Sequence, residues 1–132
     1  MQYLLSEDIL QVHSIVIDET GGSHGVRDRH AVASLQELPR QHAFGSELYP
    51  TVFLKAAVYI RNIIFSHPFI DGNKRTAMAA GAVFLELNGY RITVAKSGIE
   101  MFALEIIAKR HDLAAVAEWL ENNSSRVSRK KK

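Results

Sequence analysis

Apolar residues recur at helical spacing along most of the chain, and strand-like alternation is confined to one short stretch. Behind Ser6, which fits an N-cap, Ile9 and Val16 share one helical face. Two longer patterns, 49–65 and 73–87, carry apolar residues on nearly every face, which is typical of central, buried helices. Shorter amphipathic patterns predict helices at 31–38, 97–109 and 112–122.

Turn-forming residues separate these patterns. Pro39 ends the helical pattern before it, and Pro50 suits the first turn of the next helix, where a missing N–H is harmless. Residues 40–47 are expected to form a loop, and 90–94 is the one plausible strand, short enough for half of a β-hairpin. The sequence therefore predicts an all-α bundle of about six helices in a single domain, residues 1–125.

Composition narrows the class of protein. The 132 residues are 47% hydrophobic and 23% charged, as in an ordinary soluble globular domain. The absence of cysteine excludes disulfides, thiolate nucleophiles and Cys-ligated zinc, and it suits a reducing cytosol. There is no signal-peptide pattern, and the uncharged runs are too short to span a bilayer. We expect a cytoplasmic protein that does not cross a membrane.

The basic charge is concentrated at the C-terminal end. Five of the 16 Lys and Arg residues lie in 126–132, so the body carries eleven basic against 14 acidic residues. The net charge of +2 therefore gives no reason to expect a nucleic-acid-binding body. The tail 126–132 is expected to be a solvated, disordered end; the alternative is a weak contact with RNA or an acidic partner.

One segment between the two apolar patterns, "SHPFIDGNKRTA" at 66–77, concentrates polar groups. The first N–H groups of a helix lack partners within it and lie at its positive dipole end, where anions bind. Gly72 lets a ligand approach the backbone closely. Lys74 and Arg75 are unfavourable in a first helical turn unless an anion lies between them. The segment therefore predicts a phosphate site.

The same segment offers groups for proton transfer and metal binding. Histidine titrates near neutral pH, so His67 is a candidate general base for a hydroxyl beside the phosphate. Asp71 is a candidate ligand for a Mg²⁺ ion that bridges phosphate oxygens. Asn73 suits a helix cap or an amide donor, whereas Phe69 and Ile70 are expected to pin the loop to the core.

Other histidines carry no comparable signal. They show no spacing typical of metal ligands, and we expect them at the surface or in loops: His13, His24, His30, His42 and His111.

The stretch "HPFIDGNKRTA" resembles the signature of the Fic/Doc (Fido) superfamily. The stretches "TGGSHGVRDRHAVASLQELP" and "AMAAGAVFLELNGYRI" are similar to its upstream loop and downstream helix. Typical Fic adenylyltransferases have a glycine where this chain has Lys74, and a second arginine where it has Met78. The Asn-Lys-Arg version resembles the death-on-curing (Doc) toxin branch, which implies a protein kinase. A lysine there also fills space and adds a point charge suited to a terminal phosphate.

The resemblance implies specific roles. His67 would be the general base, Asp71 would bind Mg²⁺ or orient the base, and Gly72, Asn73, Lys74 and Arg75 would hold the phosphates of ATP. Part of the groove for the protein substrate would come from the upstream loop, through Gly21, Gly22, Gly25, Arg27 and Asp28.

The partners are also implied by resemblance. The target would be elongation factor Tu, modified on a Ser or Thr, so that translation stops. No inhibitory Ser/Thr-x₃-Glu motif of self-restrained Fic enzymes is found, so restraint would come from an antitoxin whose disordered tail folds on the toxin. Two alternatives stay open: a nucleotidyltransferase that transfers AMP or UMP, and a non-catalytic member that binds a nucleotide or partner.

Overall fold

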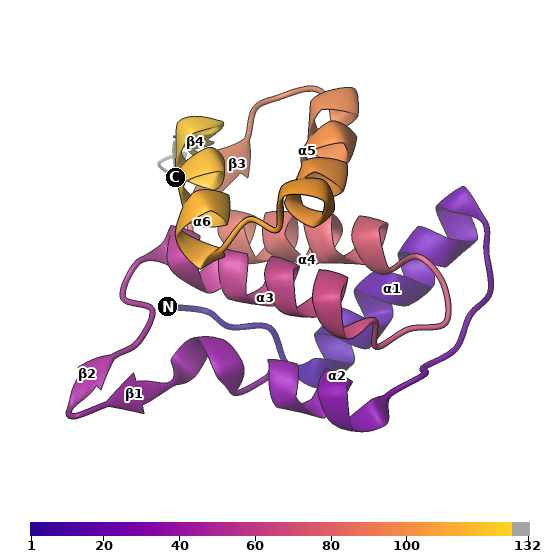
Figure 1. Ribbon diagram of the computed structural model, residues 1–132, viewed down its shortest axis with the longest axis horizontal. Helices are drawn as coiled ribbons and strands as arrows, with labels where there is room; N and C mark the ends of the chain where they lie inside the picture. Colours follow the sequence, from indigo (N-terminus) through magenta and orange to yellow (C-terminus); the bar gives the residue numbers. More distant parts are fainter. Residues whose placement is uncertain (128–132) are drawn as a thin grey trace, which may run out of the picture.

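The computed structural model describes residues 1–127, in which six α-helices enclose a single core (Figure 1). The predicted all-α bundle is confirmed. The helices are α1 (Ser6–Thr20), α2 (Arg29–Leu35), α3 (Val52–Ser66), α4 (Asn73–Leu87), α5 (Lys96–Lys109) and α6 (Leu113–Asn122). A 3₁₀ helix, η1, covers Leu38–Arg40, and the strands are β1 (His42–Ala43), β2 (Ser46–Glu47), β3 (Tyr90–Ile92) and β4 (Ser124–Arg126).

Helices α3 and α4 form the centre of the bundle. In Figure 1 they lie between α5 and α6 on one side and α1 and α2 on the other. Nine of the 15 residues of α3 are buried, as expected of a helix that carries apolar residues on nearly every face. The two central helices approach closely because α4 carries Gly81, where a Cβ atom would lie only 2.5 Å from Cδ1 of Ile60. This close pair fixes the loop that joins them.

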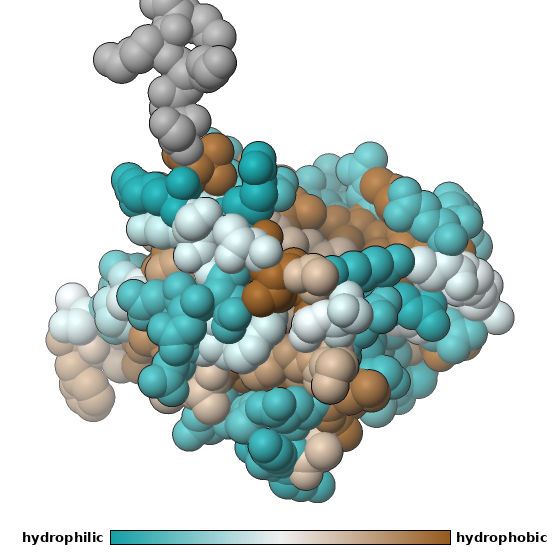
Figure 2. Space-filling model, turned by 90° about the horizontal axis from the view of Figure 1, so that it is seen from above, coloured by the Kyte–Doolittle hydropathy of each residue, from teal (hydrophilic) through white to brown (hydrophobic). Residues whose placement is uncertain are grey.

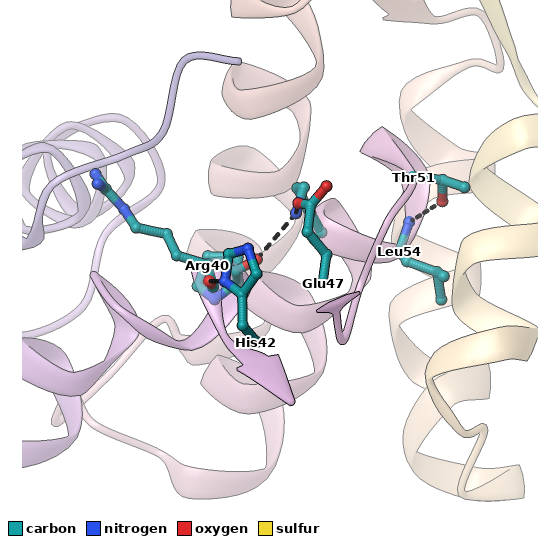
Figure 3. Close-up of polar contacts among 7 residues, drawn as sticks. Arg40, His42, Glu47, Thr51 and Leu54 are labelled. Atoms are coloured by element: carbon teal, nitrogen blue, oxygen red, sulfur yellow. Dashed lines mark hydrogen bonds and ion pairs between the residues drawn. The ribbon is translucent and has the colours of Figure 1, made fainter. Parts of the chain in front are cut away.

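The starts of two helices differ from their predicted positions because of local capping. Leu5, not Ser6, is the N-cap of α1, and the carboxylate of Asp8 accepts the Leu5 N–H at 2.8 Å. The hydroxyl of Thr51 accepts the N–H of Leu54 at 3.0 Å (Figure 3). That cap starts α3 at Val52, so Pro50 lies before the helix rather than in its first turn.

Helix α2 is shorter at its C-terminal end than the predicted 31–38. It begins at Arg29 because the Asp28 carboxylate accepts the Ala31 N–H at 3.0 Å. It ends at Leu35, before Pro39, which lies inside the following 3₁₀ helix. A first turn tolerates proline because its N–H groups have no partner there.

Residues 40–47, expected as a loop, contain the hairpin β1–β2. Its two-residue turn, Phe44-Gly45, has positive φ at both positions, which suits the twist of a tight hairpin. The hairpin is anchored by Lys55 of α3, which is only 1% exposed. Its Nζ donates to Oε1 of Glu47 at 2.6 Å and to the carbonyl of Pro39 at 3.2 Å (Figure 3).

The predicted strand near residue 90 exists and has a partner from the end of the domain. Strand β3 pairs antiparallel with β4, and the Arg126 guanidinium donates to the Tyr90 hydroxyl at 2.8 Å. Assigning Arg126 to a disordered tail was therefore wrong, because backbone pairing includes it in the domain. Val127 of the predicted tail is also described, and its N–H donates to the carbonyl of Gly89 at 2.8 Å. The remaining tail residues, 128–132, lie outside the described residues. Within residues 1–127, no helix has the length and apolar character needed to cross a bilayer.

Candidate active site

The segment that joins α3 to α4, residues 67–72, is called the HPF loop below. His67 is the C-cap of α3 in the left-handed conformation (φ 48°), and its N–H donates to the carbonyl of Ile63 at 3.2 Å. A non-glycine residue pays about 1–2 kcal/mol for that conformation. Gly72, with φ 74°, is the N-cap of α4. The loop thus turns the chain back within a few residues, and His67 is exposed at its start.

Asn73 closes the HPF loop on itself. Its Oδ1 accepts the N–H of Phe69 at 3.0 Å, and its Nδ2 donates to the carbonyl of Phe69 at 2.9 Å. Both ends of the amide are therefore occupied by one backbone residue. The side chain holds the loop, so a phosphate contact by Asn73 would have to come from its backbone N–H in the first turn of α4.

The loop borders a cavity of about 440 Å³ between the end of α3 and the start of α4. It brings together all six residues predicted for catalysis and phosphate binding: His67, Asp71, Gly72, Asn73, Lys74 and Arg75. Arg27 is the third cation in its lining, and Asp71 is the one carboxylate among the described residues that line it. This surplus of positive charge suits a polyanion such as a triphosphate.

Helix α1 orients one of these cations. The guanidinium of Arg75 donates through Nη1 to the hydroxyl of Thr20 at 2.7 Å. That hydroxyl in turn donates to the carbonyl of Val16 at 2.7 Å, so its direction is fixed by the end of α1. The Arg75 side chain, which comes from the first turn of α4, is thereby held against the end of α1.

The glycine-rich segment 21–28 lies along the HPF loop and fixes it by backbone bonds. Val26 forms an antiparallel bridge with Phe69, and the N–H of Ile70 donates to the carbonyl of Gly25 at 3.1 Å. The N–H of Ser23 donates to Oδ2 of Asp71 at 3.0 Å. One carboxylate oxygen of Asp71 is thus oriented by the backbone.

Only one of the five residues predicted for the substrate groove lines the cavity. Arg27 does; Gly21 caps α1, and Asp28 caps α2. Gly22 and Gly25 instead let the segment pass close to the loop. A Cβ on Gly22 would lie 3.4 Å from the Asp71 side chain, and one on Gly25 would lie 2.6 Å from the Ile70 side chain.

The two apolar residues of the loop behave differently. Phe69 is buried, at 1% exposure, and pins the loop to the core as predicted. Ile70 is 57% exposed, so its predicted role as a second pin was wrong. The Ile70 side chain points away from the core. It follows Phe69 in an extended segment that pairs with Val26, and successive side chains of such a segment point to opposite sides.

His13 lies beneath the loop, although the sequence placed it at the surface. It is 4% exposed, its ring stacks on Phe69 with centroids 3.9 Å apart, and its Nε2 lies 2.8 Å from the carbonyl oxygen of Asp71. Since a carbonyl only accepts, Nε2 carries the proton and donates. The available signal was its spacing from Ile9 and Ile17, two other buried residues of α1.

The sequence comparison agrees with this geometry. Residues 3–85 match the sequence profile of the Fic/DOC family, well over half of the chain. The chain belongs to the Fic/DOC family. The matched region runs from α1 through most of α4 and so contains the whole HPF loop and the segment that fixes it.

Two relatives carry the name of the Doc branch. Toxin Doc of Mycolicibacterium smegmatis is 36% identical over 91 residues, which cover 69% of this chain and 68% of the relative. Protein kinase doc of Escherichia phage P1 is 29% identical over 93 residues, covering 70% of this chain and 72% of the relative. These similarities place this chain in the Doc branch of the Fic/DOC family.

Proposed function

We propose that this protein is a Doc-like toxin that transfers the γ-phosphate of ATP to a Ser or Thr hydroxyl of a target protein. The observation that carries the proposal is Lys74, which replaces the glycine of adenylyltransferases and lines the cavity at the start of α4. A point charge there favours a terminal phosphate, whereas a glycine admits a pyrophosphate threaded along the backbone. The name Protein kinase doc of the phage P1 relative supports the same reaction.

The proposed step is an in-line phosphoryl transfer. The hydroxyl oxygen of the target attacks the γ-phosphorus, and its proton passes to the imidazole of His67. The bond between that phosphorus and the β–γ bridging oxygen breaks, and ADP leaves. Lys74, Arg75 and the first N–H groups of α4 would neutralise the charge on the phosphoryl oxygens.

Mg²⁺ fits the residues present. Ser23 occupies one carboxylate oxygen of Asp71, which leaves Oδ1 for a metal ligand. The described residues form no cluster of three or more His, Cys, Asp or Glu side chains. That suits Mg²⁺, which commonly binds through one or two carboxylates and completes its shell with phosphate oxygens and water. The ion would neutralise phosphate charge and orient the leaving group.

Transfer of label from ATP tests the reaction. The purified protein is incubated with Mg²⁺ and elongation factor Tu, the target proposed by resemblance, using ATP labelled at either the α or the γ position. We expect γ-label alone to reach the target, and no label with His67→Ala. Label from the α position alone would instead identify a nucleotidyltransferase.

Growth arrest on expression separates an enzyme from a binding protein. Arrest by the wild-type chain that disappears in His67→Ala supports an enzymatic toxin. Arrest that survives this substitution would favour a non-catalytic member that acts by binding. We propose that the reaction takes place in the cytoplasm, where the proposed substrates, ATP and elongation factor Tu, would be met.

We also propose that an antitoxin covers the groove between α1, α4 and α5. This groove, of about 670 Å³, is lined by Met78, Ile99 and Leu104. It shares Lys74 and Arg75 with the cavity beside the HPF loop, called the phosphate cavity below. Figure 2 shows hydrophobic surface lying open between hydrophilic borders. An amphipathic segment that folds on binding matches such a groove and would restrict access to the cavity.

A charge placed in the groove tests this partner. The chain is co-expressed with the product of a small gene next to its own, and growth is followed. We expect that product to relieve the arrest caused by the wild-type chain but not by Leu104→Glu, whose side chain is exposed and outside the phosphate cavity. Equal relief of both would contradict this site.

A further inference from the structure

Arg27 reaches from the segment before α2 to the C-terminal end of α3. Its Nε donates to the carbonyl of His67 at 2.7 Å, and its Nη2 donates to the carbonyl of Ser66 at 2.6 Å. Its backbone N–H donates to the carbonyl of Pro68 at 2.8 Å. One residue thus binds three consecutive carbonyl oxygens that surround the proposed base, across about 40 positions of sequence.

These carbonyls pose an electrostatic problem for an anion site. The last C=O groups of a helix lack partners within it and form the negative end of its dipole. The phosphate cavity lies between this end of α3 and the positive end of α4, and His67 lines it. Without a counter-charge, the carbonyls of α3 would therefore oppose the phosphate that α4 attracts.

The guanidinium of Arg27 supplies that counter-charge at the required place. It binds the two carbonyls directly and lines the same cavity as Lys74 and Arg75. The shape also matters, because a planar guanidinium offers two nitrogens in a fixed fork, whereas a lysine ammonium offers a point charge. The fork fixes the peptide units on which the His67 imidazole is mounted.

Arg27 is itself held on a rigid element. The next residue, Asp28, caps α2 by accepting the N–H of Ala31 at 3.0 Å, and its own N–H donates to the carbonyl of Pro68 at 3.0 Å. The hydrogen bonds of Arg27 therefore connect the end of α3 to the start of α2 rather than to a free loop. Such support is what a precisely placed catalytic base requires.

We propose that Arg27 is a positioning residue with two effects on transfer: its fork fixes the backbone of His67, and its charge offsets the negative end of α3 beside the phosphates. This inference rests on the proposed phosphate-transfer site and adds a residue outside the HPF loop to it. The sequence alone had assigned Arg27 to the protein-substrate groove.

Two substitutions separate the two effects. Arg27→Lys keeps the charge but loses the fork, so we expect the affinity for Mg·ATP to stay within about twofold while kcat falls about tenfold. Arg27→Met loses both, so we expect Mg·ATP to bind about tenfold more weakly and kcat to fall at least as far. Calorimetry with Mg·ATP gives the affinity, and transfer of label gives kcat and KM.

The matched control is Arg29→Met. Arg29 is an exposed arginine two positions away, in the first turn of α2, and its side chain makes no hydrogen bond or ion pair within residues 1–127. We expect its affinity and kcat to equal those of the wild type. Thermal unfolding of every variant is followed as well, and if Arg27→Met does not fold, Arg27→Lys carries the test.

The outcomes are distinguishable. If Arg27→Lys keeps the wild-type kcat, the fork has no positioning role and the inference is overturned. If Arg27→Met folds and also keeps the wild-type affinity, the charge has no effect on the phosphate either. If the wild-type chain binds no Mg·ATP and transfers no label, the proposed function fails first, and the inference that rests on it fails with it.

Discussion

Removing one hydroxyl, in Tyr59→Phe, tests how the N-terminal segment is held on the core. Tyr59 lies in α3 and is fully buried, and its hydroxyl oxygen accepts the backbone N–H of Leu4 at 3.0 Å. Leu4 is 1% exposed, so water cannot replace the lost partner. A buried N–H left without a partner costs about 1–3 kcal/mol, and we expect the free energy of unfolding to fall by that amount at neutral pH.

The same hydroxyl makes stability depend on alkaline pH. Burial is the main cause that raises the pKa of Tyr59 to about 12, from an ordinary 10. Because the pKa of Tyr59 is higher in the folded state than in the unfolded state, the folded state keeps the phenol proton to higher pH. The stability that the protonated phenol contributes is therefore complete below pH 10 and is lost as the pH rises towards 12. A shift of two units corresponds to up to about 2.7 kcal/mol.

Urea denaturation followed by the fluorescence of Trp119 measures both effects. The wild type should be more stable than Tyr59→Phe at about pH 8, and the advantage should shrink towards zero by about pH 12. Tyr49→Phe, at a half-buried tyrosine without a hydrogen bond among the described residues, serves as the control. Wild-type and Tyr59→Phe stabilities that stay parallel over this range would refute the reasoning.

Three further changes test packing, charge and loop position. Gly81→Ala should destabilise by about 1–2 kcal/mol in urea, since the new Cβ meets the buried Ile60 side chain, and an equal cost in an Ile60→Val background would contradict this. The bond from Lys55 lowers the pKa of Glu47 below its ordinary 4.5, so acidification through that range should lower the melting temperature of the wild type more than that of Glu47→Gln; equal slopes would count against the pair. His13→Phe keeps a ring stacked on Phe69 but loses the hydrogen bond to the HPF loop. Label transfer should slow by roughly three- to tenfold with little change in melting temperature. An unchanged transfer rate would show that this hydrogen bond has no role in transfer.

The candidate site could be predicted largely from sequence because its groups are close along the chain. His67 and Arg75 are separated by a single loop, and a helix that starts at Asn73 necessarily directs its first N–H groups into that loop. The role of the Asn73 side chain was less accessible. An amide can cap, bind a ligand or fold back on the backbone, and only the position of Phe69 decided for the last.

The helices of the fold were predicted for a similar local reason, while their exact starts depended on competing caps. Thr51 excludes Pro50 from α3 because its hydroxyl reaches Leu54, a bond the apolar pattern does not report. The hairpin around Phe44 was missed because each strand is only two residues long and its support is Lys55, a charge buried in the central helix. Short strands owe their existence to what they pack against.

The sequence by itself determined which groups gather at the candidate site: a histidine, a carboxylate and two cations around the start of a helix, in the Doc version of the motif. It did so because those groups are neighbours along the chain, and helical geometry fixes how near neighbours lie. The tertiary structure decided what holds them. His13 and Arg27 act on the HPF loop from 58 and 40 positions away, and only the packing of α1 and α2 against α3 and α4 brings such distant groups into hydrogen-bonding range.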